Sequence, residues 1–217
     1  MIAANLESIR SELPANVKLL AVSKFQPVEK LTEAYQAGQR LFGENRPQEL
    51  AAKAPALPQD IEWHFIGHLQ TNKLKMVLPY ASLVESVDSL HLLEAVDEWG
   101  AAHDKVIPVL LEMHIGAEET KQGFYEEEVL DILFRAEKFR HIRFCGLMGM
   151  ASHTDDAETV RADFTRISTY LDYLRDLFPE LDAFTELSIG MSEDWRISVE
   201  CGSTEVRIGS AIFGPRA

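Results

Sequence analysis

The sequence predicts a (β/α)₈ barrel, and three observations support this fold class. Short apolar, β-rich runs recur along the chain, segments with helical spacing separate them, and 217 residues suit eight such units near the lower end of this fold's size range. The runs are almost wholly apolar, which is typical of strands buried on both faces in a parallel sheet. An open doubly wound sheet is the alternative. Because the chain has no long linker or low-complexity tract, we expect residues 1–217 to form one domain.

Two periodicities define the expected elements. The predicted strands are Leu19–Ser23, Arg40–Gly43, Ile61–Gly67, Ser82–Val87, Val106–Ile115, Ile142–Met150, Glu186–Ile189 and Glu205–Phe213. The segments between them repeat apolar residues at i, i+3, i+4 and i+7 and carry acidic opposite faces, which predicts amphipathic helices. These helices are Val28–Ala37, Leu90–Ala102, Glu126–Phe139 and Ala157–Leu177, with a similar segment, Ile2–Glu12, before the first strand.

The composition excludes several classes of partner. The net charge of −14 would repel phosphate backbones over most of the surface, so we expect no nucleic-acid partner. No window approaches the roughly 18 apolar residues of a membrane helix, and no leader segment is recognisable, so we expect a cytoplasmic protein. Cys145 and Cys201 lie far apart in the sequence, which favours reduced thiols over a disulfide or zinc site. We also expect a monomer.

Lys24 ends the first predicted strand, in the stretch "AVSKFQP". The carboxyl ends of barrel strands carry the loops that build functional sites, so this lysine would lie at that rim. Leu20 and Val22 would partly remove it from water, and desolvation favours the neutral, nucleophilic amine. A plain surface lysine is the simpler alternative, and the other strand ends decide between the two.

A phosphate site is predicted where the last two strands end. Ser188–Ser192 places serines and glycine where the seventh strand turns into a helix headed by Glu193–Asp194, and the next strand brings Arg207, Gly209 and Ser210. Glycines allow close backbone approach, N–H groups at a helix start point at an anion, and barrels often bind phosphate after strands seven and eight. An amine nucleophile and a phosphate cradle on one rim together suggest pyridoxal 5′-phosphate (PLP).

Seven motifs carry a resemblance that covers about residues 19–214. They are "AVSK", "FGEN", "WHFIGHLQTNK", "VESVDS", "GLMGM", "SIGMS" and "VRIGSAIFG". Together they resemble the pyridoxal phosphate homeostasis protein family, also called the YggS or proline synthase co-transcribed family. The resemblance implies a fold-type III PLP barrel like the N-terminal domain of alanine racemase. It also implies a protein without robust catalytic activity that buffers or delivers PLP to PLP-dependent apoenzymes and influences amino-acid and keto-acid pools.

The resemblance also implies roles for individual residues. Lys24 would hold PLP as a Schiff base, Asn45 would lie close to the cofactor, and Arg207 would face the pyridine nitrogen. Other cofactor-binding positions implied are Ser192, Gly209 and Ser210 at the phosphate, and Met148 and His153 lining the pocket.

Two positions qualify this assignment. Arg46–Pro47 departs from the family pattern after "FGEN", and because proline lacks an N–H and restricts its predecessor, the start of the following helix would shift near Asn45. Lys121, in "ETKQGF", is either a second amine for transient cofactor transfer or a plain loop lysine; the second reading is favoured.

Other titratable residues are assigned structural roles. His64 and His68 are spaced as in a zinc helix, but the residues between them suit a strand, so we expect no metal. Glu85 and Asp88 are either an acid pair or caps of the next helix, and capping is favoured.

Three functions remain open. A PLP homeostasis protein is favoured, a racemase-like enzyme of low activity is the alternative, and a barrel aldolase whose lysine attacks a substrate carbonyl is third. A two-base racemase needs a base opposite the lysine, and none of the five tyrosines lies in a recognisable rim motif. A permanently charged Arg207 at the ring nitrogen would also weaken the ring as an electron sink. We therefore assign no catalytic residue.

Overall fold

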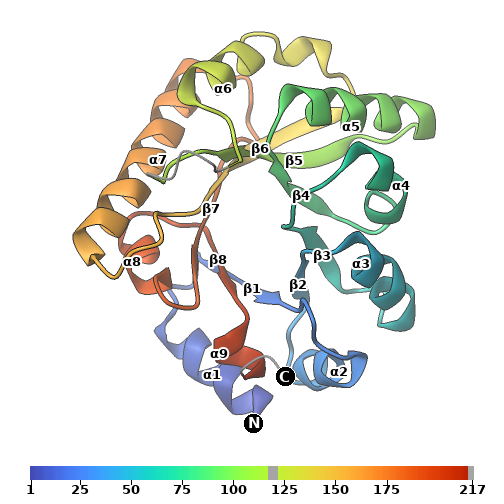
Figure 1. Ribbon diagram of the computed structural model, residues 1–217, viewed down its shortest axis with the longest axis vertical. Helices are drawn as coiled ribbons and strands as arrows, with labels where there is room; N and C mark the ends of the chain where they lie inside the picture. The colour runs from blue at the N-terminus through green and yellow to red at the C-terminus, as the bar shows by residue number, and fades with distance from the viewer. Residues whose placement is uncertain (117–121, 215–217) are drawn as a thin grey trace.

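The eight strands form one closed parallel barrel in chain order (Figure 1). This computed structural model describes residues 1–116 and 122–214. The strands are β1 (Lys18–Val22), β2 (Leu41–Glu44), β3 (Glu62–Phe65), β4 (Leu83–Val87), β5 (Ile107–Met113), β6 (Ile142–Gly149), β7 (Glu186–Met191) and β8 (Glu205–Ile208). Pairing of β1 with β8, from Lys18 opposite Glu205 to Ala21 opposite Ile208, closes the barrel. The predicted barrel is therefore confirmed, and the open sheet is wrong.

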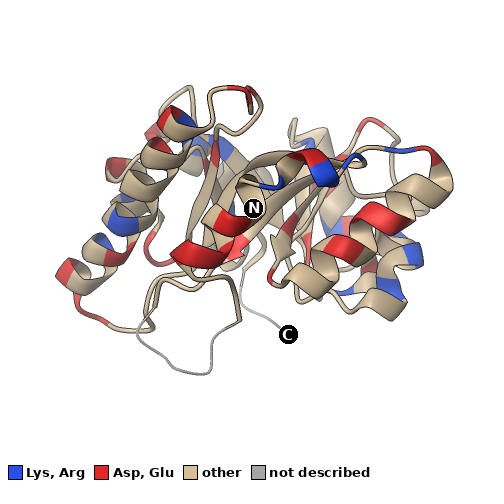
Figure 2. Ribbon diagram, turned by 90° about the horizontal axis from the view of Figure 1, so that it is seen from above, with Lys and Arg blue, Asp and Glu red and all other residues tan. Residues whose placement is uncertain are grey.

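Helices surround the barrel and bury their apolar faces against it (Figure 1). They are α1 (Ile2–Glu12), α2 (Val28–Gln36), α3 (Pro47–Lys53), α4 (Leu74–Val77), α5 (Leu90–His103), α6 (Glu126–Leu133), α7 (Ala157–Leu177), α8 (Trp195–Glu200) and α9 (Ser210–Phe213), with 3₁₀ turns at Ala54–Ala56, Thr71–Lys73 and Ala136–Lys138. Acidic residues are spread over these outer helices, with Lys and Arg among them (Figure 2). No helix in the described part of the chain is long and apolar enough to cross a membrane.

Two predicted elements end earlier than expected. The eighth strand stops at Ile208 rather than Phe213, because Ile212 and Phe213 turn into the short α9, which contacts α1 and is fixed there by an N–H···O bond from the Asn5 amide to the Ile212 carbonyl of 2.9 Å. The predicted helix Glu126–Phe139 is α6 followed by a separate 3₁₀ turn. The other strand boundaries agree with the prediction to within two residues.

Two apolar layers and one charged layer make up the interior. The main core lies between the strands and the helices, while Leu83, Leu110 and Met148 form a small separate cluster. Because side chains alternate along a strand, Glu205 and Arg207 share one face of β8, and both are buried. Charged side chains therefore occupy positions that branched apolar residues usually fill in such barrels.

Candidate cofactor site at the carboxyl ends of the strands

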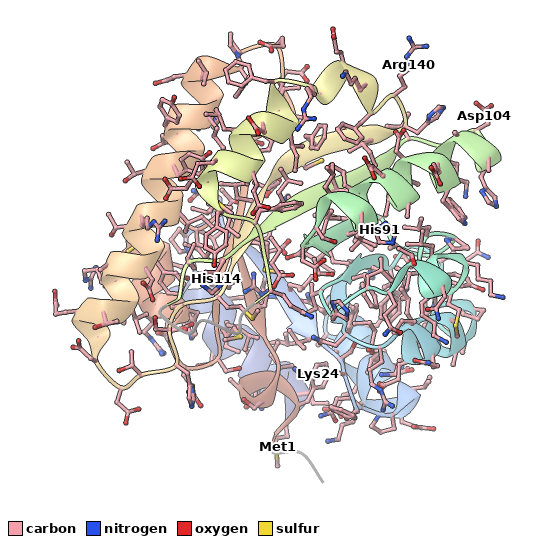
Figure 3. All side chains as sticks on the ribbon, turned by 45° about the horizontal axis from the view of Figure 1, so that its top comes forward. Met1, Lys24, His91, Asp104, His114 and Arg140 are labelled. Carbon is pink, nitrogen blue, oxygen red and sulfur yellow. The ribbon has the colours of Figure 1, made fainter. Side chains whose placement is uncertain are left out.

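Four of the predicted site residues lie directly after neighbouring strands. Lys24 follows β1, Asn45 follows β2, Ser192 follows β7 and Gly209 follows β8. In the closed barrel these strands are adjacent in the order β7, β8, β1, β2, so all four residues lie on one arc of the same rim. Figure 3 labels Lys24, which is half-buried at this rim.

The ends of β7 and β8 are joined at the predicted phosphate cradle. The Gly209 N–H donates to the Ser192 Oγ at 3.3 Å, and Ser210 begins α9 immediately after. Gly190 lies within β7 and has a φ of +94°, a conformation that favours glycine, and a Cβ there would lie 2.0 Å from the Ser198 Oγ. A side chain at position 190 would therefore clash with Ser198 on α8.

Ser188 is not part of this cradle. The sequence grouped it with Ser192, but its hydroxyl is fully buried inside the barrel and donates to the Glu85 carboxylate at 2.5 Å. Ser188 lies within β7, whereas Ser192 follows the carboxyl end of that strand. The predicted helix after β7 is present and begins at Trp195.

Asn45 presents a buried acceptor at the rim. Its Oδ1 has no hydrogen-bond partner among residues 1–116 and 122–214, and its Nδ2 makes only a 3.5 Å contact to the Ile66 carbonyl. A Cβ at Gly67 would lie 2.1 Å from the Asn45 carbonyl oxygen, so this glycine lets the ends of β2 and β3 meet. Pro47 is simply the first residue of α3, where its missing N–H costs nothing. An unpaired buried amide oxygen fits a site that receives a ligand donor.

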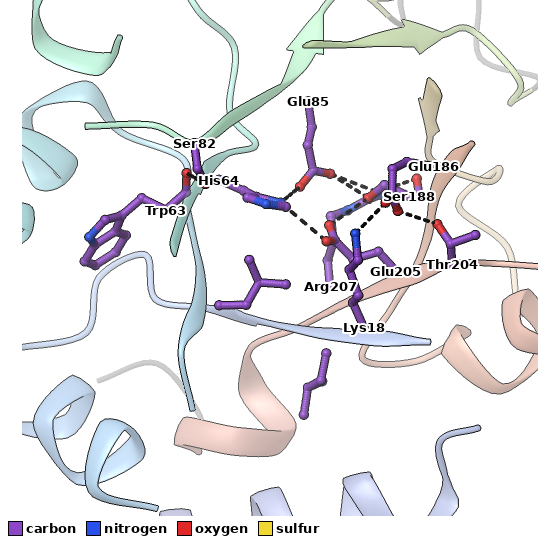
Figure 4. Close-up of polar contacts among 12 residues, drawn as sticks. Lys18, Trp63, His64, Ser82, Glu85, Glu186, Ser188, Thr204, Glu205 and Arg207 are labelled. Atoms are coloured by element: carbon purple, nitrogen blue, oxygen red, sulfur yellow. Dashed lines mark hydrogen bonds and ion pairs between the residues drawn. The ribbon is translucent and has the colours of Figure 1, made fainter. Parts of the chain in front are cut away.

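The barrel interior below the rim holds a hydrogen-bonded ionic network (Figure 4). The His64 Nδ1 lies 2.7 Å from a Glu85 oxygen and 3.4 Å from a Glu205 oxygen. Arg207 donates to the Ser188 carbonyl at 2.6 Å and to its hydroxyl at 2.7 Å, and its guanidinium lies 4.0 Å from Glu85. Two cationic and two acidic side chains therefore offset one another in a region closed to water.

The network shifts the pKa of each member. Burial lowers the pKa of His64, but the carboxylates of Glu205 and Glu85 outweigh it and raise this pKa to about 10. Burial raises the pKa of Glu85, yet the bond to His64 and the nearby Arg207 outweigh it and hold this pKa at about 2. For Glu205, burial and the charge of Glu85 raise the pKa to about 7. Glu85 is therefore the more acidic of the two buried carboxyl groups.

These positions correct one prediction and refine another. Glu85 does not cap the next helix; Ser89 does, accepting from the Leu92 N–H at 3.3 Å. His64 and His68 do not form a pair, because His68 contacts Asp88 at 3.0 Å instead. His64, Glu85 and Glu205 do offer ligand atoms within 4.8 Å of one another, a spacing that could suit a metal ion. In this structure their direct hydrogen bonds and the neighbouring Arg207 form an ion-pair network.

Glu112 is expected to make the stability of the protein depend on pH. Burial, assisted by the charge of Asp88 and opposed by Arg207, raises its pKa from 4.5 to about 7. The folded protein therefore holds a proton that the unfolded chain releases, so the free energy of unfolding falls as the pH rises from about 4.5 to about 7. The fall from this group reaches about 3 kcal/mol. Urea denaturation at several pH values in this range measures the free energy of unfolding. Its decrease with pH should be smaller in Glu112→Gln than in wild type or in the exposed control Glu94→Gln. A decrease in Glu112→Gln as large as in wild type would contradict the assignment.

The remaining predicted residues lie in different surroundings. Met148 is buried in the barrel against Leu83 and Leu110, and His153 is exposed in the loop after β6. Arg207 is buried in the network, where it also donates to the Gly149 carbonyl at 2.9 Å. Lys121 lies outside the described residues. The cofactor-binding roles of Met148, His153 and Arg207 therefore stay predictions.

Comparison with known proteins identifies a family and two solved structures to which this chain is similar. The family described as "Alanine racemase, N-terminal domain" matches residues 1–217. The pyridoxal phosphate homeostasis protein of Pasteurella multocida is 39% identical over 203 residues, covering 92% of this chain and 87% of the relative. Two solved structures of PipY from Synechococcus elongatus, one without and one with PLP bound, are 36% identical, with TM-scores of 0.94 and 0.91 and coverage of 99% of this chain and 100% of theirs.

The chain belongs to the pyridoxal phosphate homeostasis protein family. The resemblance predicted from the sequence motifs is thereby confirmed, as is the fold it implied.

Proposed function

We propose that this protein binds PLP on Lys24 and acts in PLP homeostasis. The observation that carries the proposal is a single arc of the rim with a half-buried lysine, a Gly–Ser cradle, and a buried amide oxygen that has no partner among the described residues. The relatives named for PLP homeostasis and the PipY structure with PLP bound support the same ligand.

The residues of the arc would bind different parts of the cofactor. The Ser192 hydroxyl, the Gly209 backbone and the Ser210 hydroxyl would hold the phosphate, and Asn45 would accept a hydrogen bond from the cofactor. Arg207 would face the ring nitrogen, with Met148 and His153 lining the pocket. When bound, the cofactor would supply an aldehyde that links covalently to an amine.

In the cell, the bound cofactor would be buffered and delivered to PLP-dependent apoenzymes, with effects on amino-acid and keto-acid pools. We propose that the protein does this as a monomer in the cytoplasm. Lys121 would, at most, serve as a transient second amine.

The proposal is tested by adding PLP to the purified protein and recording its absorption spectrum. A covalent link to lysine should give a band in the near-visible that borohydride removes, and peptide mapping should place the reduced label on Lys24. Absence of the band, or a label on Lys73 or Lys121 with Lys24 unmodified, would refute the assignment.

Ser192→Ala should weaken PLP binding by about 1 to 3 kcal/mol, because a hydroxyl partner of a charged phosphate is lost. Unphosphorylated pyridoxal should bind to this variant as it does to wild type, since Ser192 is assigned to the phosphate alone. Equilibrium titration with both ligands measures the difference, and the exposed Ser11→Ala on α1 is the control. Equal losses for both ligands would instead place the effect on the fold.

A further inference from the structure

Side chains from the second β/α unit hold the backbone on both sides of Lys24. The Lys53 Nζ, at the end of α3, donates to the Ser23 carbonyl at 2.8 Å. On the other side, the Phe25 N–H donates to a Glu49 carboxylate oxygen at 2.9 Å. The residues before and after Lys24 are therefore both tied to the same helix.

Lys53 is the centre of this arrangement. Besides the Ser23 carbonyl, its ammonium contacts Glu44 at 2.6 Å and Glu49 at 2.7 Å. An ammonium has three N–H donors, and these three acceptors match that number. Ser23 closes the arrangement from the strand side, because its hydroxyl donates to Glu44 at 2.8 Å. The position of the Ser23 carbonyl is thus fixed from two directions.

The arrangement buries two charged side chains, which costs free energy of desolvation. The side chain of Glu44 is 0% exposed and that of Lys53 only 8%. Within the described part of the chain, the Glu44 Oε2 has no hydrogen-bond partner, and burial, opposed by Lys53, raises the Glu44 pKa. Apolar residues of similar volume often replace a buried ion pair at no loss of stability. Stability alone therefore does not account for these buried charges.

Backbone strain lies in the same turn. Phe25 has a φ of +62°, in the left-handed region that residues with a Cβ seldom adopt, and it is not a glycine. Such a conformation persists only where the surroundings hold it, and it is concentrated at functional sites. Here the bond from Phe25 to Glu49 holds it, and the Arg46 guanidinium lies 5.4 Å from the Phe25 ring.

We propose that Lys53, together with Glu44 and Glu49, is a positioning clamp that sets the Lys24 amine for its covalent bond to an aldehyde. This inference rests on the proposed function. In its neutral form, the Lys24 amine would displace the aldehyde oxygen as one molecule of water and leave a C=N bond. Lys53 acts through the backbone of Ser23, so it sets the position of the Lys24 amine. The phosphate cradle lies at the ends of β7 and β8 and does not depend on Lys53.

The test compares two ligands that share the phosphate and the ring. PLP carries the aldehyde, whereas pyridoxine 5′-phosphate carries an alcohol and cannot form a C=N bond. The ratio of their affinities therefore measures the contribution of Lys24. In Lys53→Met we expect this ratio to fall by about tenfold or more and the near-visible band to form more slowly. The affinity for pyridoxine 5′-phosphate should stay at the wild-type value.

Matched variants separate this effect from a loss of folding. Lys18→Met makes the same change at the opposite end of β1, where Lys18 pairs with Glu186, and should leave the ratio unchanged. Should Lys53→Met fail to fold, Glu49→Ala removes the Phe25 anchor from a more exposed position and should lower the ratio in the same direction. Circular dichroism of the apoproteins verifies folding.

The outcomes distinguish the inference from the function on which it rests. Equal weakening of both ligands, or an unchanged ratio in folded Lys53→Met or Glu49→Ala, would overturn the clamp. Absence of the band in wild type, or its persistence in Lys24→Ala, would overturn PLP binding on Lys24 itself.

Discussion

Lys24→Ala is expected to abolish the near-visible absorption band that PLP produces with the wild-type protein. Alanine has no amine, so the cofactor would be held only by its phosphate and ring contacts. Of the changes considered, this one has the largest expected effect on binding, because it removes the covalent link entirely. The phosphate cradle at Ser192 and Gly209 lies on other strands, so weak noncovalent binding should remain.

Absorption spectra of wild type and variant at equal PLP concentration measure this effect. Lys75→Ala, which removes an exposed lysine from α4, is the matched control and should keep the full band. Borohydride treatment followed by peptide mapping provides a second reading. A band of undiminished intensity in Lys24→Ala would show that another amine carries the cofactor.

Glu85→Ala is expected to lower the free energy of unfolding by about 3 to 5 kcal/mol, which is the largest expected effect on stability. Glu85 is fully buried between His64 and Ser188, and its removal leaves the positive charges of His64 and Arg207 facing Glu205 alone. It also leaves a cavity where four side-chain atoms were packed.

Urea or guanidinium denaturation measures the loss. Glu94→Ala on the exposed face of α5 is the control and should change the free energy of unfolding by no more than about 0.5 kcal/mol. Glu85→Gln tests the charge separately, since it keeps most of the volume while removing the negative charge. A loss below about 1 kcal/mol in Glu85→Ala would show that the network contributes little to stability.

Sequence reasoning missed the interior network although a signal was present. Four ionisable residues interrupt otherwise apolar strand runs: His64, Glu85, Glu205 and Arg207. The period of two along a strand places Glu205 and Arg207 on one face, but it does not say whether that face points into the barrel or toward the helices. Only the closed sheet shows that all four side chains point inward and meet.

The contacts that form the clamp around Lys24 could not be predicted from the sequence either. Glu44 belongs to the "FGEN" motif, yet Lys53 and Glu49 lie in a helix that is too short for its periodicity to be recognised. Their bonds to Ser23 and Phe25 join segments more than twenty residues apart, and no local pattern encodes such a contact.

The sequence by itself predicted the barrel ahead of an open sheet, and with it the rim that carries Lys24, Asn45, Ser192 and Gly209. Burial of apolar runs and the alternation of two periods are local properties, and in a parallel barrel every strand ends at the same rim. Tertiary structure alone decided that Ser188 faces inward and away from Ser192, that β8 stops at Ile208, and that Lys53 holds the turn at Lys24. These features depend on which distant side chains meet once the barrel closes, because a hydrogen bond or ion pair forms only at contact distance and its partner is chosen by the packing of the whole chain.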